Sequence, residues 1–116
     1  MRPLLPVIIN PALGGKKIQL MAMIDTGADE CALPAAFAAI LGHTLDQGSS
    51  KEVGTAGGRT TAWSHTANIF IEGLGGHDAT VDFIPGLEIP ILGVNSFLSN
   101  YILTIDYPRK MFSLEY

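Results

Sequence analysis

The sequence predicts a small, mostly β domain with one or two short helices. Runs of β-branched and other apolar residues recur along the chain, and clusters of glycine and proline separate them. A stretch rich in alanine has the character of a short helix. The chain has 116 residues, which is near the common size of one domain, so we expect a single domain spanning residues 1–116.

The first half of the chain predicts a hairpin followed by a short helix. A β-branched run at 6–10 and a run at 16–25 that becomes continuously apolar are separated by a turn cluster at 11–15. This spacing predicts two strands joined by a hairpin loop, with the second strand entering the interior. Further on, "PAAFAAILG" predicts a helix with Pro34 at its first position and Gly42 as its stop.

The second half of the chain alternates between strand-like runs and turn clusters. Residues 45–73 predict a strand, a glycine-rich turn and a second strand. Residues 77–86 predict another strand after a turn at 73–76. Residues 101–116 predict a closing hairpin that turns at 108–110.

Composition and charge exclude several classes of protein. Apolar residues make up 47% of the chain and charged residues 16%, which excludes a disordered chain. The net charge is −4 and the lysines and arginines are scattered, so we expect no nucleic-acid partner. The longest near-apolar run, residues 31–41, is far shorter than the roughly 18 residues of a membrane span, so we expect no membrane association.

The cysteine content and the first residues bear on the cellular compartment. The single Cys31 forbids an internal disulfide and fits a reducing compartment. The opening "MRPLLPVIIN" has only a broken apolar segment and does not resemble a signal peptide. We therefore expect a soluble protein that is cytoplasmic rather than exported. Cys31 is expected to be structural or incidental, because the neighbouring acids raise the pKa of a thiol.

A cluster of acids follows the apolar strand in the stretch "MIDTGADECALP". Asp25, Asp29 and Glu30 lie within six residues there. Burying a carboxylate costs several kcal/mol unless something compensates, so Asp25 lies either in a solvated turn or in a site where the cost serves function. An isolated Asp-Thr-Gly favours the turn, because a three-residue match is weak.

The context of the Asp-Thr-Gly favours function. Ala28 and Asp29 follow the glycine, "VGTAGGRTTA" comes next along the chain, and Ile91–Gly93 then precedes a short helical stretch expected at 94–100. In their order and spacing these motifs resemble the retropepsin-like aspartic proteases, one-lobe enzymes that work as homodimers. The resemblance covers nearly the whole chain. It implies a retropepsin-like acid-protease fold, with one lobe per chain and a flap hairpin.

The resemblance also implies the hydrolysis of peptide bonds by a water that two aspartates activate. The chain carries one Asp-Thr-Gly, so Asp25 would meet its counterpart from a second copy across a two-fold axis. Two carboxyl groups about 3 Å apart share a proton and serve as acid and base. The implied protein is a homodimeric aspartic endopeptidase that acts on extended peptides or proteins, with no cofactor and no metal.

The residues around the aspartate take roles from the same resemblance. Thr26 would form a hydrogen bond across the dimer axis, and Gly27 would let the backbone approach a bound peptide closely. Ala28 offers no hydroxyl to the dyad, so we expect activity at mildly acidic to near-neutral pH. Asp29 and Glu30 would line the substrate groove, although a solvated turn is an equal alternative for Glu30.

The glycine-rich hairpin matches the place of the family's flap. Gly54, Gly57 and Gly58 would give a mobile tip that closes over substrate and excludes water. An ordinary flexible hairpin is the alternative, since glycine marks turns whatever their use. A phosphate-binding loop is excluded, because Val53 stands where that motif needs glycine and Arg59 where it needs lysine.

Apolar pockets are expected to select the substrate. Ile24, Val53, Ile84 and Ile91 would line them and favour hydrophobic residues beside the cut. Trp63 would reach the groove or the dimer interface, or else be an ordinary buried aromatic.

The Ile-Leu-Gly motif is expected to pack beside the active-site loop, with Gly93 allowing close backbone approach. Val94 stands where retroviral relatives commonly carry an arginine that pairs with the acid at the position of Asp29. Asp29 would then need another partner, and we expect Arg109 or Arg59.

The three histidines, His43, His65 and His77, lack the spacing of metal ligands and are expected on the surface or in loops.

Two alternatives to an active enzyme stay open. A catalytically silent module of the same fold could serve dimerisation or peptide binding, although it has no need for a costly carboxylate pair. A protease that stays monomeric and inactive until two copies assemble would also fit the small core.

Overall fold

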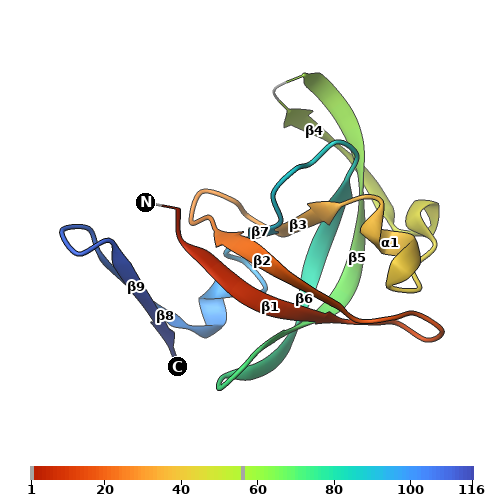
Figure 1. The fold of residues 1–116 in the computed structure, drawn as a ribbon. Helices are drawn as coiled ribbons and strands as arrows, with labels where there is room; N and C mark the ends of the chain where they lie inside the picture. The colour runs from red at the N-terminus through yellow and green to blue at the C-terminus, as the bar shows by residue number, and fades with distance from the viewer. Residues whose placement is uncertain (1, 56) are drawn as a thin grey trace.

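The computed structural model describes residues 2–55 and 57–116, and across them the chain forms nine strands and one four-residue helix (Figure 1). The strands are β1 (Leu4–Asn10), β2 (Ile18–Ile24), β3 (Cys31–Pro34), β4 (Ser49–Thr55), β5 (Gly58–Ile71), β6 (Gly75–Ile84), β7 (Ile91–Leu92), β8 (Ile102–Asp106) and β9 (Met111–Glu115). The helix α1 spans Phe37–Ile40, and short 3₁₀ turns span Leu45–Gln47 and Leu98–Asn100. The predicted mostly β fold is confirmed.

The main sheet closes on itself into a barrel-like lobe. In the described part of the chain, its seven strands follow the order β1-β2-β7-β3-β6-β5-β4, and β1 also pairs with β5. The strands β8 and β9 form a separate antiparallel hairpin, which projects from the lobe at the same end as the N-terminus (Figure 1). The lobe therefore has two projecting parts, this hairpin and the far end of the β4–β5 hairpin.

The core fills the inside of the curved sheet, and alternation along the strands supplies it. Val7 and Ile9 of β1 are buried, and Ala22 and Ile24 of β2 face the same interior. Phe83 of β6, Leu92 of β7 and the following Phe97 are among the largest fully buried side chains. Burying each side chain of this size contributes roughly 1.5–3 kcal/mol, so the inward face of the sheet holds the lobe together.

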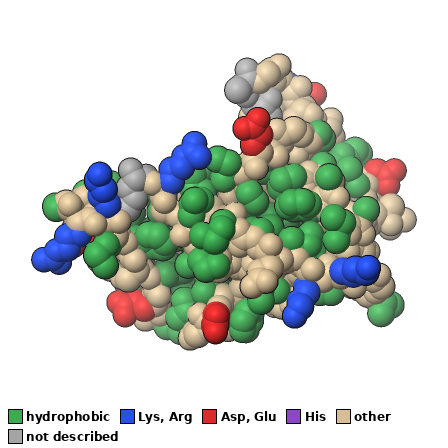
Figure 2. Space-filling model, in the orientation of Figure 1, with side chains coloured by type: hydrophobic (Ala, Val, Ile, Leu, Met, Phe, Trp, Pro, Cys, Tyr) green, Lys and Arg blue, Asp and Glu red, His purple; other side chains and the backbone are tan. Residues whose placement is uncertain are grey.

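Apolar side chains also reach the surface. Leu4 and Met21 are exposed on β1 and β2, Leu13 is exposed in the turn between these strands, and Ile40 is exposed at the end of α1. Figure 2 shows hydrophobic side chains spread over the face seen in the orientation of Figure 1. Exposed apolar surface of this kind is common on small domains.

The predicted N-terminal hairpin is confirmed, because β1 and β2 pair antiparallel from Leu4↔Met23 to Ile9↔Ile18. The predicted placement of Pro34 is wrong. Pro34 ends strand β3, where it pairs with Ile84, and α1 begins only at Phe37. Proline lacks an N–H group, so it is tolerated at a strand end better than within a ladder.

Several further boundaries differ from the prediction. Gly75 and Gly76 belong to β6 rather than to the preceding turn. Residues 94–97 form a turn and 98–100 a 3₁₀ turn, in place of a regular helix. The closing hairpin is confirmed, with Lys110 in its turn at φ 54°. Within residues 2–55 and 57–116, no helix has the length and apolar character needed to cross a membrane.

Candidate active site

Asp25 lies directly after β2, where the chain turns sharply. Its backbone N–H donates to the Leu92 carbonyl at 3.0 Å, and its own carbonyl accepts from Ala28 N–H at 3.1 Å. The Gly27 N–H donates to Asp25 Oδ1 at 2.9 Å. The carboxylate is half-buried, with one oxygen oriented by the backbone of its own turn. The turn thus holds an acid at the surface end of an interior strand.

The segment after β7 braces the loop of residues 25–30, which we call the Asp25–Glu30 loop. Val94 N–H donates to the Ala28 carbonyl at 2.9 Å, and Asn95 N–H donates to the Asp29 carbonyl at 2.8 Å. A Cβ at Gly93 would lie 2.3 Å from the Glu30 carbonyl oxygen, a contact that real side chains do not make. The predicted close approach at Gly93 is confirmed, and only glycine permits it.

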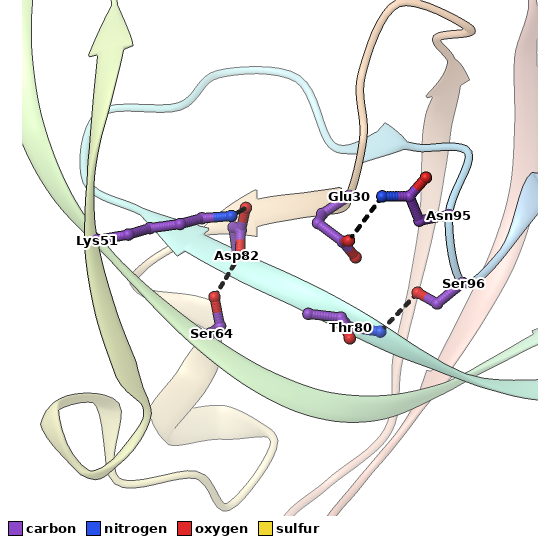
Figure 3. A network of polar contacts seen from close by, with 7 residues as sticks. All are labelled: Glu30, Lys51, Ser64, Thr80, Asp82, Asn95 and Ser96. Atoms are coloured by element: carbon purple, nitrogen blue, oxygen red, sulfur yellow. Dashed lines mark hydrogen bonds and ion pairs between the residues drawn. The ribbon is translucent and has the colours of Figure 1, made fainter.

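Side chains continue this bracing toward β6. Asn95 Nδ2 donates to Glu30 Oε1 at 3.2 Å, and Thr80 N–H donates to Ser96 Oγ at 2.8 Å (Figure 3). Glu30 is half-buried, and its other oxygen, Oε2, is buried without a hydrogen-bond partner among the described residues. These contacts tie the loop, the turn after β7 and β6 into one unit.

Cys31 lies directly behind this loop and is 1% exposed. Its Sγ accepts from Gly93 N–H at 3.4 Å. Burial, with a smaller contribution from the charges of Glu30 and Asp82, raises the pKa of the Cys31 thiol to about 11, although the hydrogen bond from Gly93 N–H lowers it in part. A neutral, enclosed thiol agrees with the predicted structural role.

The β4–β5 hairpin has an open tip. It pairs antiparallel from Ser49↔Ser64 to Thr55↔Gly58. A Cβ at Gly54, Gly57 or Gly58 would meet nothing within 4 Å, and Gly58 has φ +117°. In Figure 1 the tip stands clear of the rest of the lobe.

The base of the same hairpin is firmly held. Lys51 Nζ of β4 lies 2.7 Å from Asp82 Oδ2 of β6, and Ser64 Oγ of β5 donates to Asp82 Oδ1 at 2.5 Å (Figure 3). The Asp82 side chain is 8% exposed and the Lys51 side chain 44%. A buried carboxylate needs a counter-charge and hydrogen-bond donors to offset the cost of its burial. Lys51 and Ser64 supply them, so the network links three strands at the foot of the hairpin.

A groove of about 710 Å³ lies between the hairpin tip and the segment before β7. Its lining residues are Met23, Gly54, Gly57, Ile84, Pro85, Gly86, Leu87, Glu88, Ile89 and Ile91. The structure therefore brings together the predicted Gly54, Gly57, Ile84 and Ile91. The sequence analysis did not include residues 85–89 among the groove residues. The apolar residues between Pro85 and Pro90 are the pattern that could have indicated an apolar loop there.

Comparisons with known proteins bear on the family and the fold of the chain. The family described as gag-polyprotein putative aspartyl protease matches residues 9–100. The chain belongs to this family. Its predicted membership of the retropepsin-like aspartic proteases, and their one-lobe fold, are confirmed.

Two solved structures are similar to this protease-family lobe. The EIAV protease, complexed with the inhibitor HBY-793, shares 25% identity at a TM-score of 0.59, over 80% of this chain and 82% of its own. A retropepsin-like aspartic protease from Rickettsia conorii shares 24% identity at a TM-score of 0.67, over 91% of this chain and 85% of its own. No curated protein matches the sequence.

The predicted ion pair of Asp29 is wrong in this family member. Arg59 pairs with Glu52 at 3.2 Å and Arg109 with Asp106 at 3.2 Å. Each arginine finds a carboxylate within its own hairpin, which leaves the exposed Asp29 without an ion pair in the described part of the chain. The loop is held through backbone groups instead, by the hydrogen bond that the Asp29 carbonyl accepts.

Two predicted pocket residues lie away from the groove. Ile24 is 5% exposed and belongs to the core, because alternation along β2 turns it inward while Met23 faces the groove. Val53 is half-buried opposite Thr60 on β5 and is not part of the groove lining. Trp63 lies half-buried on β5, opposite Phe83 of β6.

The remaining predicted residues lie close to the aspartate. Thr26 and Gly27 are exposed and Ala28 is half-buried, so the loop presents its first residues outward.

His43 lies in the loop after α1, as predicted, whereas the other two histidines lie on strands. His65 lies on β5 and His77 on β6, and both are half-buried. The rings of His43 and His65 contact each other in a tilted arrangement, with centroids 4.9 Å apart and 54° between their planes. Within residues 2–55 and 57–116, no group of three or more His, Cys, Asp and Glu side chains is arranged to hold a metal ion.

Proposed function

We propose that the protein is an aspartic endopeptidase whose active site forms between two copies of the chain, with Asp25 from each as the catalytic pair. The observation that carries this proposal is the carboxylate of Asp25, held by Gly27 N–H at 2.9 Å in an intact Asp-Thr-Gly turn at the end of an interior strand. A purely structural turn has no need for bracing by the Leu92–Asn95 segment on top of its own hydrogen bonds. Membership of an aspartyl protease family supports the same chemistry.

The reaction follows from two carboxyl groups that share one proton. The ionised carboxylate takes a proton from a water molecule, whose oxygen attacks the carbonyl carbon of the peptide bond. The protonated carboxyl group donates its proton to the carbonyl oxygen, which stabilises the charge that develops there. A proton then passes to the peptide nitrogen, the C–N bond breaks, and an acid and an amine leave.

The second aspartate comes from a homodimer in this proposal. One chain supplies one Asp-Thr-Gly, and a two-fold axis beside Thr26 brings two of them together. The exposure of Thr26 and Gly27 supports this arrangement, because both are available to a second loop. The β8–β9 hairpin projects at the same end of the lobe and extends the surface available to a partner (Figure 1).

The β4–β5 hairpin serves as the flap, and the groove beneath it takes the substrate. An extended peptide between them pairs through its backbone, while its side chains enter the apolar groove. The open surroundings of Gly54, Gly57 and Gly58 support a tip that moves, and the Lys51–Asp82 pair supports a base that does not. In this proposal the exposed Asp29 contacts the peptide backbone, whereas the Glu30 side chain is held by Asn95, and neither residue is part of the groove lining.

The test is cleavage of a mixed peptide library between about pH 4 and pH 7, with the molecular mass measured in parallel by light scattering. Asp25→Asn is compared with wild type and with Asp46→Asn, an exposed acid in the 3₁₀ turn after α1. We expect a dimer whose cuts vanish in Asp25→Asn and persist in Asp46→Asn. Cuts that persist in Asp25→Asn would contradict the mechanism, and a stable wild-type dimer that cuts nothing would favour a silent peptide-binding module.

A further inference from the structure

The groove beneath the β4–β5 hairpin contains one acidic side chain. Apart from Glu88, the residues that line it are apolar or glycine. Glu88 is exposed and lies between Leu87 and Ile89, which are half-buried. A carboxylate set in an apolar wall is an unusual feature of a peptide groove, because an apolar substrate side chain gains nothing from it.

Glu88 has no cation beside it in the described part of the chain. The lysine and the arginine of the nearby hairpin are already paired, Lys51 with Asp82 and Arg59 with Glu52. No ion pair of the described residues includes Glu88. Its charge is therefore available to a ligand in the groove.

We propose that Glu88 makes the enzyme select substrates that carry lysine or arginine at the position facing the segment of residues 85–89. This inference rests on the proposed peptidase function and goes beyond its apolar selectivity. The aliphatic stem of a lysine or arginine packs on apolar walls while its charged head reaches a carboxylate at the rim. The groove offers both parts of this match, with Ile84, Leu87 and Ile91 as walls and Glu88 as the acceptor.

The expected selectivity is modest, because the carboxylate is exposed to solvent. Solvent-exposed ion pairs contribute about 0.2–1 kcal/mol, which corresponds to roughly 1.4- to fivefold in a rate or binding constant. The effect is also screened by salt. In a dimer the groove occurs twice, so the same preference applies on both sides of the cut.

The experiment compares matched peptides that differ only in lysine, norleucine or glutamate at one position, at about pH 6 and low salt. Norleucine keeps the aliphatic stem of lysine without its charge. The difference between the lysine and norleucine peptides therefore measures the contribution of the charge interaction with Glu88. The readouts are kcat/KM for the active protein and the equilibrium binding of fluorescent peptides to Asp25→Asn protein. The variants are Glu88→Gln and Glu88→Lys, and the matched control is Glu72→Gln, an exposed acid after β5 that is not part of the groove.

We expect wild-type protein to favour lysine over norleucine about 1.4- to fivefold in both readouts. Glu88→Gln should remove the preference, Glu88→Lys should transfer it to glutamate peptides, and Glu72→Gln should keep it. Equal treatment of lysine and norleucine by wild type, or a preference that survives in Glu88→Gln, would overturn the inference.

Failure of the inference and failure of the peptidase proposal are distinguishable. Cleavage that depends on Asp25 but does not depend on the charge of the peptide side chain would overturn only the proposed role of Glu88. Absence of cleavage removes the peptidase proposal, and the binding measurement then decides the role of Glu88 alone.

Discussion

The Asp25–Glu30 loop packs against Gly93, and the tip of the β4–β5 hairpin contains Gly54, Gly57 and Gly58, yet these glycines have opposite surroundings. At the loop, a Cβ on the facing Gly93 would lie 2.3 Å from the Glu30 carbonyl oxygen. At the tip, a Cβ on Gly54 or Gly57 would meet nothing within 4 Å. Glycine permits close backbone packing in the first region and leaves the chain unconstrained in the second.

The two regions also differ in their hydrogen bonds, which hold the loop along its length and the hairpin mainly at its foot. The carbonyl groups of Ala28 and Asp29 accept from the chain after β7, and the Asp25 N–H donates to β7 itself. The hairpin is fixed mainly at its foot, where Lys51 and Ser64 hold Asp82. The difference shows that glycine allows tight backbone packing against the acid-bearing loop and an open hairpin tip, according to what each glycine faces.

Replacing Gly93 with alanine should have the largest effect. The new Cβ meets backbone atoms of Glu30 that cannot rotate away, so we expect a loss of roughly 3 kcal/mol in the free energy of unfolding. Urea denaturation followed by circular dichroism measures it. Gly57→Ala is the matched control, and equal stability of the two variants would refute the contrast between the regions.

Replacing Lys51 with methionine should have an intermediate effect. The Asp82 carboxylate, 8% exposed, would keep Ser64 but lose its counter-charge. We expect a loss of about 1–3 kcal/mol in the free energy of unfolding, because an uncompensated buried charge is costly. Lys17→Met, at an exposed lysine, controls for the loss of one charge. A change no larger than that of the control would mean that the foot of the hairpin is not anchored by this pair.

Acidification should lower the free energy of unfolding through His43, which lies beside His65 of β5. Burial lowers the pKa of His43 below its usual 6.5, and the nearby His65 lowers it further. The unfolded chain therefore binds more protons than the folded chain as the pH falls through about 6.5, so stability is lost in that range. Denaturation of wild type and His43→Gln at pH 7.5 and pH 5 measures the effect. We expect the wild type to lose more stability than the variant, and equal losses would exclude His43 as a source.

Replacing Gly57 with alanine should have the smallest effect on stability. Its surroundings are open and its φ is not in the left-handed region, so we expect a change within about 0.5 kcal/mol. Thermal unfolding measures it. A substantial loss of stability would show that the tip packs against other residues. It would then no longer differ from the Asp25–Glu30 loop in its packing.

Local sequence signals predicted much of the fold. The alternating β1 and β2 runs, the long hairpin of β5 and β6 and the closing hairpin all follow from apolar runs between turn residues. The Asp-Thr-Gly turn and the close approach of Gly93 followed from motifs with a strong steric requirement.

The remaining features depend on partners distant in sequence. Strand β3 is four residues long and forms because β6 and β7 pair with it on either side, which no local pattern reveals. The partners of Arg59 and Arg109 are set by hairpin register and turn geometry. The placement of Ile24 in the core could have been predicted, because neighbouring residues of a strand face opposite sides and Asp25 lies outside the core.

The most direct test of the central claim is a subunit-mixing experiment. Inactive Asp25→Asn chains are added to a fixed amount of wild type, at a concentration where light scattering shows a dimer, and peptide cleavage is measured after exchange. If each active site needs Asp25 from two chains, an equal amount of the variant should reduce the activity to about half, because half of the wild-type chains then pair with an inactive partner. Activity that stays unchanged as the variant is added would contradict a site shared between two copies.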